Sequence, residues 1–467
     1  MTIMKGKSYR FRIGIMLTII ASCILCACGT KEEEKIVIEP MEKEEVASCT
    51  FDFLGGKDVM PIGGYYGPQP SELSIDGTAV PDYINEEIFK AIAESGINLI
   101  EHTYTNYDKA PEMAKKLLEL GEKYNIGIAV TDQFKDYTKA TVSQYGERIA
   151  NYSDYASFCG MYIVDEPGND TYFSTNGRPI SAYGNVFSNL DELGIWGYAN
   201  LYPLYERDKR DVYEDYVNEF LKTCKVKNLQ WDFYVNSKGH DRLDYFYNMS
   251  VIREKAEEYN IPFWPYIQAG AQWGSSAMET DGYYPDEGEF DWNVNTCLAY
   301  GAKGLGYFPV IQPIQYSYAM DETYDFERSG MIGAWGNLNR WWYYAKDINK
   351  HIAAIDEVLM NSVNKGIIVT SKQAKSDTKD SKFILEGKSW RELTDVTGDA
   401  MIGCFNYQGK SAFYVVNYDS EYAQEITLQW YDDCQFRVVQ NAETSRLEGD
   451  SVTLTMEAGE GVLVVME

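Results

Sequence analysis

The chain has 467 residues and a formal net charge of −29, with 42 Lys plus Arg against 71 Asp plus Glu. This length exceeds what a single hydrophobic core supports and predicts about two folded domains. The acidic balance disfavours nucleic acid and anionic lipid headgroups as partners of the folded part, and a hydrophobic content of 45% excludes a wholly disordered chain.

The N-terminus carries a pattern typical of bacterial secretory signals. Four basic residues precede a short apolar stretch, residues 13–24. This stretch falls short of the ~20 apolar residues that a stable membrane-spanning helix needs. It ends in Leu25-Cys26-Ala27-Cys28-Gly29, which resembles the lipobox of bacterial lipoproteins, and Ile20-Ala21-Ser22-Cys23 fits the same pattern with a shorter apolar core.

The lipobox resemblance implies a lipid anchor and a location outside the cytoplasm. In that family the signal peptide, here residues 1–27, is removed, and the cysteine that follows, here Cys28, is lipidated and becomes the mature N-terminus. We therefore expect a lipoprotein anchored to the bacterial membrane at the cell surface. Residues 28–50, which include the charged run 31–35, are predicted to form an acidic flexible tether.

The next part of the chain, residues 51–362, alternates between short apolar runs and helical stretches. The runs cover 59–66, 97–104, 126–133, 161–167, 195–200, 229–234, 262–268 and 304–308. The helical stretches cover 83–95, 112–124, 142–152, 183–193, 213–223, 243–259, 292–300 and 338–359. Such alternation requires parallel strands joined by right-handed crossovers, and eight units close as a (β/α)8 TIM barrel. An open doubly wound sheet is the rival, but residues 63–68 lack its glycine-rich phosphate turn.

The C-terminal part, residues 363–467, has a different texture. Short strands rich in β-branched and aromatic residues recur at turn-like intervals, at 366–369, 412–417, 425–430, 436–439 and 461–465. No helical period separates them. The sequence therefore predicts a small antiparallel β-sandwich behind the barrel.

Cysteines and histidines are too scattered to build a metal centre. Six cysteines lie beyond the lipobox without a C-x-x-C or a short regular spacing, and the three histidines are far apart in sequence. This pattern fits neither a disulfide scaffold nor a zinc site. We expect most of these cysteines to be buried free thiols, and we predict no metal and no other cofactor.

Polar and aromatic residues occupy the carboxyl ends of the predicted strands, where barrel active sites are built. Three carboxylates are the catalytic candidates: Asp165, Glu166 and Asp232. The candidate substrate-binding residues are Tyr65, His102, Tyr104, Gln133, Asn200, Tyr234, Gln268, Trp273 and Tyr307.

This lining suits a neutral ligand that is rich in hydroxyl groups. It holds no basic cluster for a phosphate and no Ser-His or Cys-His pair. Aromatic rings with a polar tip pack well against sugar faces, and the chain has 38 Tyr. On such a ligand a pair of carboxylates cleaves glycosidic bonds, because one protonates the leaving oxygen while the other supports the oxocarbenium-like centre. The predicted substrate is an oligo- or polysaccharide.

Two segments carry a resemblance to a known group of proteins. They are Met161-Tyr162-Ile163-Val164-Asp165-Glu166-Pro167 at the fourth strand and residues 298–308, LAYGAKGLGYF, at the eighth. Both resemble bacterial barrel glycoside hydrolases, most closely secreted proteins related to the family 42 β-galactosidases. The resemblance covers about residues 55–362, and the small β-domain also fits. It implies that Glu166 is the acid/base residue of a glycosidase.

The sequence departs from that group at two positions. Asp165 stands where the group usually has Asn, and the seventh strand ends in Gln268 where the group has a nucleophilic Glu. A Gln cannot form a glycosyl ester, so the second catalytic group stays open. The adjacent Asp165-Glu166 pair also resembles the substrate-assisted hexosaminidases, in which the Asp orients an acetamide nucleophile.

Other carboxylates are alternatives for the second role. Asp232 lies two strands away at the same end of the barrel, and a separation of roughly 6.5–9.5 Å between its carboxyl group and that of the acid would suit an inverting water mechanism. Adjacent strand residues point to opposite faces, so Asp165 and Glu166 flank one bond only if the chain bends at Pro167. The acidic loop 279–291 forms a solvated face, supplies the missing carboxylate, or provides oxygen ligands for Ca²⁺.

Two interpretations of different classes follow. The first is a cell-surface glycosidase in which Glu166 is the general acid. The second is a barrel that has lost hydrolysis and binds a glycan, for which Gln268 is the main support.

Overall fold

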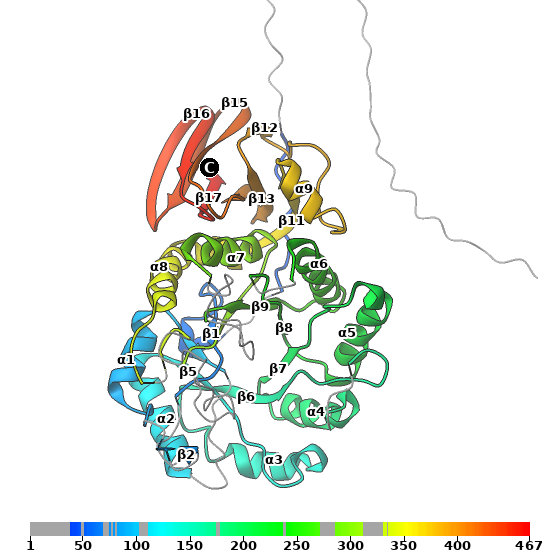
Figure 1. Cartoon of the computed structure of the whole chain (residues 1–467), viewed down its shortest axis with the longest axis vertical. Coiled ribbons are helices and arrows are strands. Elements are labelled where there is room, and N and C mark those ends of the chain that lie inside the picture. The colour runs from blue at the N-terminus through cyan, green and yellow to red at the C-terminus, as the bar shows by residue number, and fades with distance from the viewer. Residues whose placement is uncertain are drawn as a thin grey trace, which may run out of the picture. The chain divides into compact units, whose positions relative to one another are not determined.

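A computed structural model of the chain describes residues 38–47, 51–68, 74–75, 78–79, 82–101, 111–173, 178–236, 240–270, 285–311, 330–333 and 335–467. The barrel and the C-terminal sheet belong to one unit, residues 38–467 (Figure 1). The predicted signal peptide and Cys28 lie outside the described residues.

Eight parallel strands close into a barrel, which confirms the predicted TIM architecture. The strands are β1 (Ile62–Gly64), β4 (Leu99–Ile100), β5 (Gly127–Val130), β6 (Phe158–Asp165), β7 (Gly197–Leu201), β8 (Leu229–Asp232), β9 (Phe263–Gln268) and β10 (Leu305–Phe308). Their order around the barrel is β1-β10-β9-β8-β7-β6-β5-β4, so each strand pairs with its neighbours in sequence and β1 closes the ring against β10. A short antiparallel pair, β2 (Ser74–Ile75) and β3 (Thr78–Ala79), follows β1.

Helices surround this barrel, as Figure 1 shows. They are α1 (Glu86–Glu94), α2 (Pro111–Tyr124), α3 (Val142–Ile149), α4 (Gly184–Glu192), α5 (Arg210–Cys224), α6 (Arg242–Glu258), α7 (Glu287–Ala299) and α8 (Arg340–Met360). Capping residues in the sequence fix where two of these helices begin. Thr141 and Gln144 form a capping box at α3, and Asp286 and Glu289 form another at α7, which begins five residues before the predicted position.

Aromatic side chains fill the barrel interior, among them Tyr162, Tyr198 and Trp264. Glycines on the strands make room for them. A Cβ at Gly306 would lie 2.5 Å from the ring of Tyr266, and a Cβ at Gly63 would lie 2.1 Å from a carboxylate oxygen of Glu101. The interior is therefore packed tightly enough that two strand positions admit no side chain.

The C-terminal domain is antiparallel, as predicted. Its strands are β11 (Ser362–Val369), β12 (Leu393–Thr397), β13 (Ala400–Tyr407), β14 (Lys410–Asn417), β15 (Gln424–Gln440), β16 (Glu443–Met456) and β17 (Gly461–Met466), with a short helix α9 (Lys372–Asp377). They pair in the order β11-β13-β14-β17-β15-β12, with β16 beside β15. The two strands predicted at 425–430 and 436–439 are one long strand, β15. The strand β16 was not predicted, because its first half is charged and exposed and so lacks the apolar residues that indicate a strand.

The barrel and the C-terminal domain are joined by buried polar contacts. At the amino-terminal end of β10, the Nζ of Lys303 donates to the carbonyl oxygens of Leu359 and Ser362, the latter at 2.6 Å. On α7, the side chain of Asn295 accepts from the hydroxyl of Tyr414 at 2.6 Å. Lys303 therefore has a structural place at the base of the barrel, far along the strand from the carboxyl end.

Part of the predicted flexible tether lies against the C-terminal domain. The amide of Met41 donates to the carbonyl oxygen of Gly409 at 3.0 Å, and Lys365 forms an ion pair with Glu44 at 3.0 Å. The side chain of Asn406 donates to the carbonyl oxygen of Glu42 at 2.7 Å. Residues 38–47 are thus held by backbone and side-chain contacts, which the charge pattern of the segment did not indicate.

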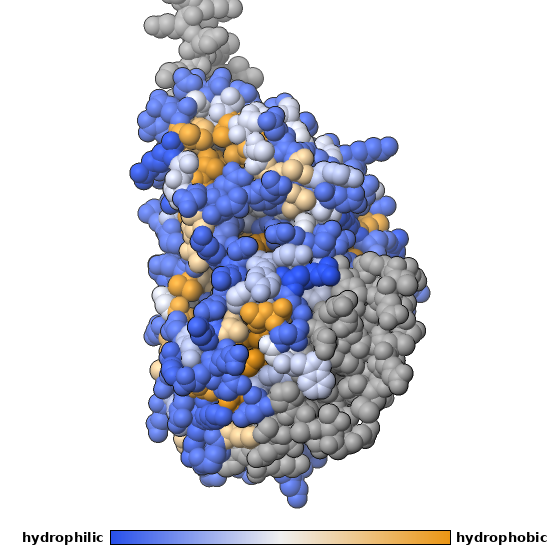
Figure 2. Space-filling view, turned by 60° about the vertical axis from the view of Figure 1, so that its left-hand side comes forward, coloured by the Kyte–Doolittle hydropathy of each residue, from blue (hydrophilic) through white to orange (hydrophobic). Residues whose placement is uncertain are grey.

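The surface matches the acidic composition. Figure 2 shows a face on which hydrophilic residues predominate and hydrophobic residues form small separate patches. Within the described ranges, no helix is both long and apolar enough to cross a membrane. The cysteines in these ranges are free thiols, four of them buried, as predicted.

Candidate active site

Three carboxylates meet at the carboxyl end of the barrel, and we call Asp165, Glu166 and Asp232 the carboxylate cluster. Asp165 ends β6 and Asp232 ends β8. The pairing of β6 with β7 shifts register between Tyr162 and Val164, which is a β-bulge, and Glu166 has a left-handed backbone with φ of +48°. These two irregularities bring adjacent residues to one site, where the charges of Asp165 and Asp232 raise the pKa of Glu166 and the charge of Asp165 raises that of Asp232. The chain bends at Glu166, one residue before the predicted position.

Asn200, near the end of β7, joins two members of the cluster. Its Nδ2 donates to Oδ1 of Asp232 at 2.9 Å and lies 3.3 Å from Oδ1 of Asp165. The two carboxylate oxygens are therefore at most about 6 Å apart, the sum of these distances. Asn200 was predicted to contact substrate, but its amide donor is already engaged by the two carboxylates.

Tyrosine hydroxyls provide further donors to the two aspartates. Asp165 accepts from Tyr65 and from Tyr162, whose hydroxyl oxygen lies 3.3 Å from Oδ1. Asp232 accepts from Tyr234. The tyrosines Tyr65 and Tyr234, predicted as substrate-binding residues, thus lie in the site and hold its acids.

Burial and mutual repulsion change the protonation of the cluster. Burial, together with the charges of Asp232 and Asp165, raises the pKa of Glu166 to about 9, against an opposing effect of Arg178. Burial and Asp165 raise the pKa of Asp232 to about 7, although the bonds from Asn200 and Tyr234 favour its charged form. Burial also raises the pKa of Asp165. Glu166 therefore holds its proton to a higher pH than Asp232 does.

Of the other predicted substrate-binding residues, Gln133 and Gln268 bond to backbone carbonyl groups. Gln133 donates to the carbonyl oxygen of Ile163, inside the bulge, at 3.1 Å. Gln268 ends β9, is 3% exposed and donates to the carbonyl oxygen of Gly270 at 3.2 Å. His102, Tyr104 and Trp273 lie outside the described residues.

Tyr307 is a correction to the prediction. Its hydroxyl donates to Oδ1 of Asn349 on α8 at 2.7 Å, and its ring stacks on Phe290 of α7. Strand alternation is the reason: on β10 the neighbouring Gly306 faces the barrel interior, so Tyr307 points outward into the helix layer. Asp132 shows the same outward orientation, since Arg148 on α3 binds its carboxylate through two nitrogens.

A fourth buried carboxylate was not among the catalytic candidates. Glu101, directly after β4, is fully buried and accepts from Tyr266 at 2.8 Å and from Gln230. Burial raises its pKa to about 7. Its position at a strand end was visible in the sequence, but its bonds to residues on β8 and β9 depend on barrel closure.

Aromatic rings line the region beside Glu166. Tyr202 stacks on Phe173 with ring centroids 3.7 Å apart and planes 1° apart, and Tyr205 stacks on His240 at 4.5 Å. Burial raises the pKa of both Tyr202 and Tyr205, and the charge of Glu166 adds to this increase. These aromatic residues follow β6, β7 and β8 in loops, where sequence alone offers no periodic signal.

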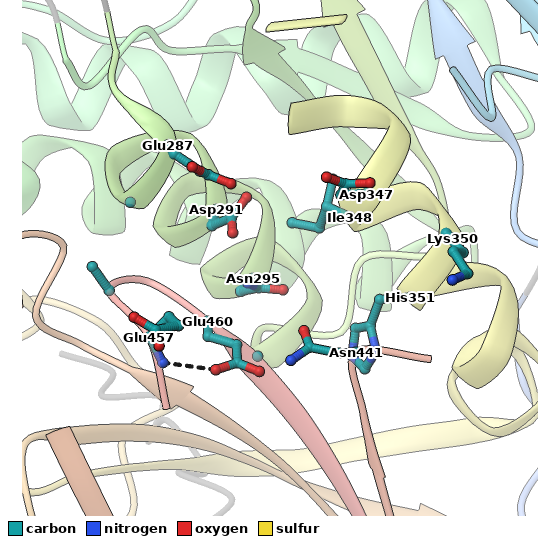
Figure 3. Close-up of a pocket in the computed structure, with 13 residues that line it drawn as sticks. Glu287, Asp291, Asn295, Asp347, Ile348, Lys350, His351, Asn441, Glu457 and Glu460 are labelled. Carbon is teal, nitrogen blue, oxygen red and sulfur yellow. Dashed lines mark hydrogen bonds between the residues drawn. The ribbon is translucent and has the colours of Figure 1, made fainter. Parts of the chain in front are cut away.

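A separate cavity of about 640 Å³ lies between α7, α8 and the C-terminal domain (Figure 3). Its lining includes five carboxylates: Glu287, Asp291, Asp347, Glu457 and Glu460. Burial and the charges of Glu287, Glu460 and Asp347 hold the pKa of Asp291 well above its usual range. In the part of the chain that the structure describes, no group of His, Cys, Asp and Glu has the arrangement of a metal site.

Comparisons with known proteins find likeness in structure only. No family model matches the chain, and neither does any curated protein. Among solved structures, a putative α-L-fucosidase from Bacteroides thetaiotaomicron is 14% identical, with a TM-score of 0.40 over 67% of this chain and 99% of that chain. The family 51 α-L-arabinofuranosidase AbfB from Bifidobacterium longum is 10% identical, with a TM-score of 0.46 over 91% and 98%. An α-amylase from Geobacillus thermoleovorans is 10% identical, with a TM-score of 0.45 over 90% and 100%.

Proposed function

We propose that the chain is a cell-surface glycoside hydrolase that cleaves O-glycosidic bonds with Glu166 as general acid. The observation that carries this proposal is that Glu166 meets Asp165 and Asp232 at the carboxyl end of a TIM barrel, where burial and the two aspartates raise the pKa of Glu166 to about 9. A general acid must hold its proton near neutral pH, and a raised pKa provides this. The aromatic residues beside Glu166 supply faces on which a sugar ring can pack.

The aspartate pair has a different role from Glu166. The bonded oxygens of Asp165 and Asp232 are at most about 6 Å apart, because both lie within hydrogen-bond distance of Asn200 Nδ2. The two aspartates act together, and they stabilise positive charge at the sugar or accept a proton from water. Glu166 then donates its proton to the departing oxygen.

The substitution Glu166→Gln tests the acid role because it keeps the shape and removes the proton. We expect kcat/KM to fall by about 10²–10⁴-fold for substrates with poor leaving groups. The loss should shrink for activated aryl glycosides, whose leaving group needs little protonation. The measurement is a panel of aryl glycosides and plant and host glycans with the protein lacking residues 1–28. Equal small losses on every substrate would remove Glu166 from the role.

A second candidate function is glycan binding without hydrolysis. Gln268 favours it, because this buried amide ends β9 and cannot form a covalent glycosyl ester. If the wild-type protein binds glycans from the panel but cleaves none, this candidate replaces the first.

A further inference from the structure

Asn200 occupies a position that the proposed mechanism has not used. It lies at the end of β7, between β6 and β8, and is 4% exposed. Its Nδ2 reaches Oδ1 of Asp165 and Oδ1 of Asp232, whereas Tyr162 and Tyr234 each bond one of these acids. We infer that Asn200 is a positioning residue that holds Asp165 and Asp232 together as one ionised unit. This inference rests on the proposed function and adds a residue that controls the charge of its site.

The orientation of the Asn200 amide supports this role. Its Oδ1 is buried and has no hydrogen-bond partner among the residues that the structure describes. An orphaned buried acceptor is unfavourable, so something must compensate for it. The reversed amide would place an oxygen lone pair against two carboxylates. With Nδ2 toward them instead, both bonds are charge-assisted.

Other titratable groups also face the pair, and their effects differ. Arg178 favours the charged form of Asp165, while the charge of Asp165 raises the pKa of both Glu166 and Asp232. Phenols also lie near the pair, and burial raises the pKa of several of them, among them Tyr162, Tyr202, Tyr205 and Tyr234. Asn200 differs from all of them because it bonds both acids from a strand between theirs.

Loss of the amide donor changes the site in a defined direction. Without it, the charged form of the pair loses a hydrogen bond, and the pKa of the pair rises further. The ascending limb of kcat/KM against pH, which reports ionisation of the pair, should then move upward by about 1–2 pH units in Asn200→Leu. The isosteric Asn200→Asp adds a third carboxylate and should move that limb at least as far, while preserving the shape of the site.

Thermal unfolding provides a readout that does not need activity. A group whose pKa is raised in the folded state adds stability below its unfolded-chain pKa, and that stability is lost as pH rises through the folded-state pKa. The melting temperature of Asn200→Leu should therefore fall behind that of wild type increasingly between pH 5 and pH 9. The matched control is Asn228→Leu. Asn228 is 2% exposed just before β8 and accepts from Trp196 at 2.9 Å, outside the site. Its loss of stability should not depend on pH.

The outcomes separate this inference from the proposed function. A shifted limb with a pH-dependent gap in melting temperature in both Asn200 variants supports the positioning role. The role is overturned if kcat/KM falls equally at every pH and if the melting temperature lies below that of wild type by the same amount at every pH, as expected for Asn228→Leu. If wild type cleaves no glycoside, the proposed function fails, and the pH dependence of the melting temperatures alone decides the role of Asn200.

Discussion

At the scale of the residue, the carboxylates at one end of the barrel differ in how firmly they hold a proton. Glu166 keeps its proton because it is buried beside two other acids, and Asp232 loses its own more readily because Asn200 and Tyr234 donate to it. By contrast, Asp132 is also at a strand end but is paired with Arg148 in the helix layer. The partner of each acid, rather than its position in the sequence, decides what it does.

The pH dependence of activity follows from these partners. Ionisation of the aspartate pair, with a pKa of about 7 for Asp232, should raise kcat/KM as pH increases. Loss of the proton from Glu166, with a pKa of about 9, should lower it again. We expect a bell-shaped profile with its maximum between these values. In Glu166→Gln the descending limb should disappear for activated substrates. A descending limb that persists unchanged would assign that ionisation to another group.

At the scale of the element, close packing limits what a strand accepts. Gly63 of β1 lies against Glu101, which follows β4, and a Cβ there would also lie 3.3 Å from the carbonyl oxygen of Leu305 on β10. Helix α7 shows crowding of another kind. The cavity between it, α8 and the C-terminal domain is lined by five carboxylates against one lysine, Lys350.

Gly63→Ala should destabilise the barrel. Its Cβ has no room beside the carboxylate of Glu101, and overpacking of this kind costs about 1–3 kcal/mol. The measurement is chemical denaturation. Gly146→Ala in α3 is the matched control, since its Cβ would meet only Leu193 at 3.8 Å, and a helical Gly→Ala change should be neutral or stabilising. Equal stability of the two variants would contradict the tight interior described for β1.

Asp291→Asn should stabilise the protein at neutral and alkaline pH. The pKa of Asp291 is raised in the folded state, so its ionisation costs stability as pH rises above the value for the unfolded chain. We expect a melting temperature ~2–4 °C higher at pH 8 and little change near pH 4. The exposed Asp154→Asn serves as control and should change neither value. A gain that is the same at both pH values would argue against relief of charge repulsion.

At the scale of the whole molecule, the chain combines a barrel, a C-terminal domain and an N-terminal segment. Residues 38–47 lie along the C-terminal domain, which Lys303 in turn ties to the base of the barrel. The carboxylate cluster lies at the opposite, carboxyl end of the strands. We propose that the lipid anchor precedes this segment at Cys28.

Cys28→Ala tests the anchor. If Cys28 carries the lipid, the native protein partitions into detergent and the variant is released to the medium, because the lipid supplies the hydrophobic attachment. The measurement is detergent phase separation of the protein from its native host. Cys23→Ala is the control and should partition as wild type. Unchanged partitioning of Cys28→Ala would assign the lipid to Cys23 or exclude it.

Some features of this protein followed from sequence alone. The eight strand–helix units did, because the period of apolar residues reflects local backbone geometry, and so did the antiparallel C-terminal domain. The strand-end rule selected Asp165, Glu166 and Asp232 as candidates, since parallel strands in a barrel all end at one face. The catalytic roles of these residues remain predictions.

Tertiary structure alone decided how those candidates combine. A bulge in β6 and the left-handed backbone of Glu166 place two adjacent acids in one site, against the alternation expected of a regular strand. Alternation on β10 turns Tyr307 away from the site. The bonds from Asn200 to two acids on neighbouring strands exist only once the barrel has closed. The physical reason is common to all three: sequence patterns report on local backbone periods, whereas the charge of a buried acid depends on neighbours that are distant in the chain.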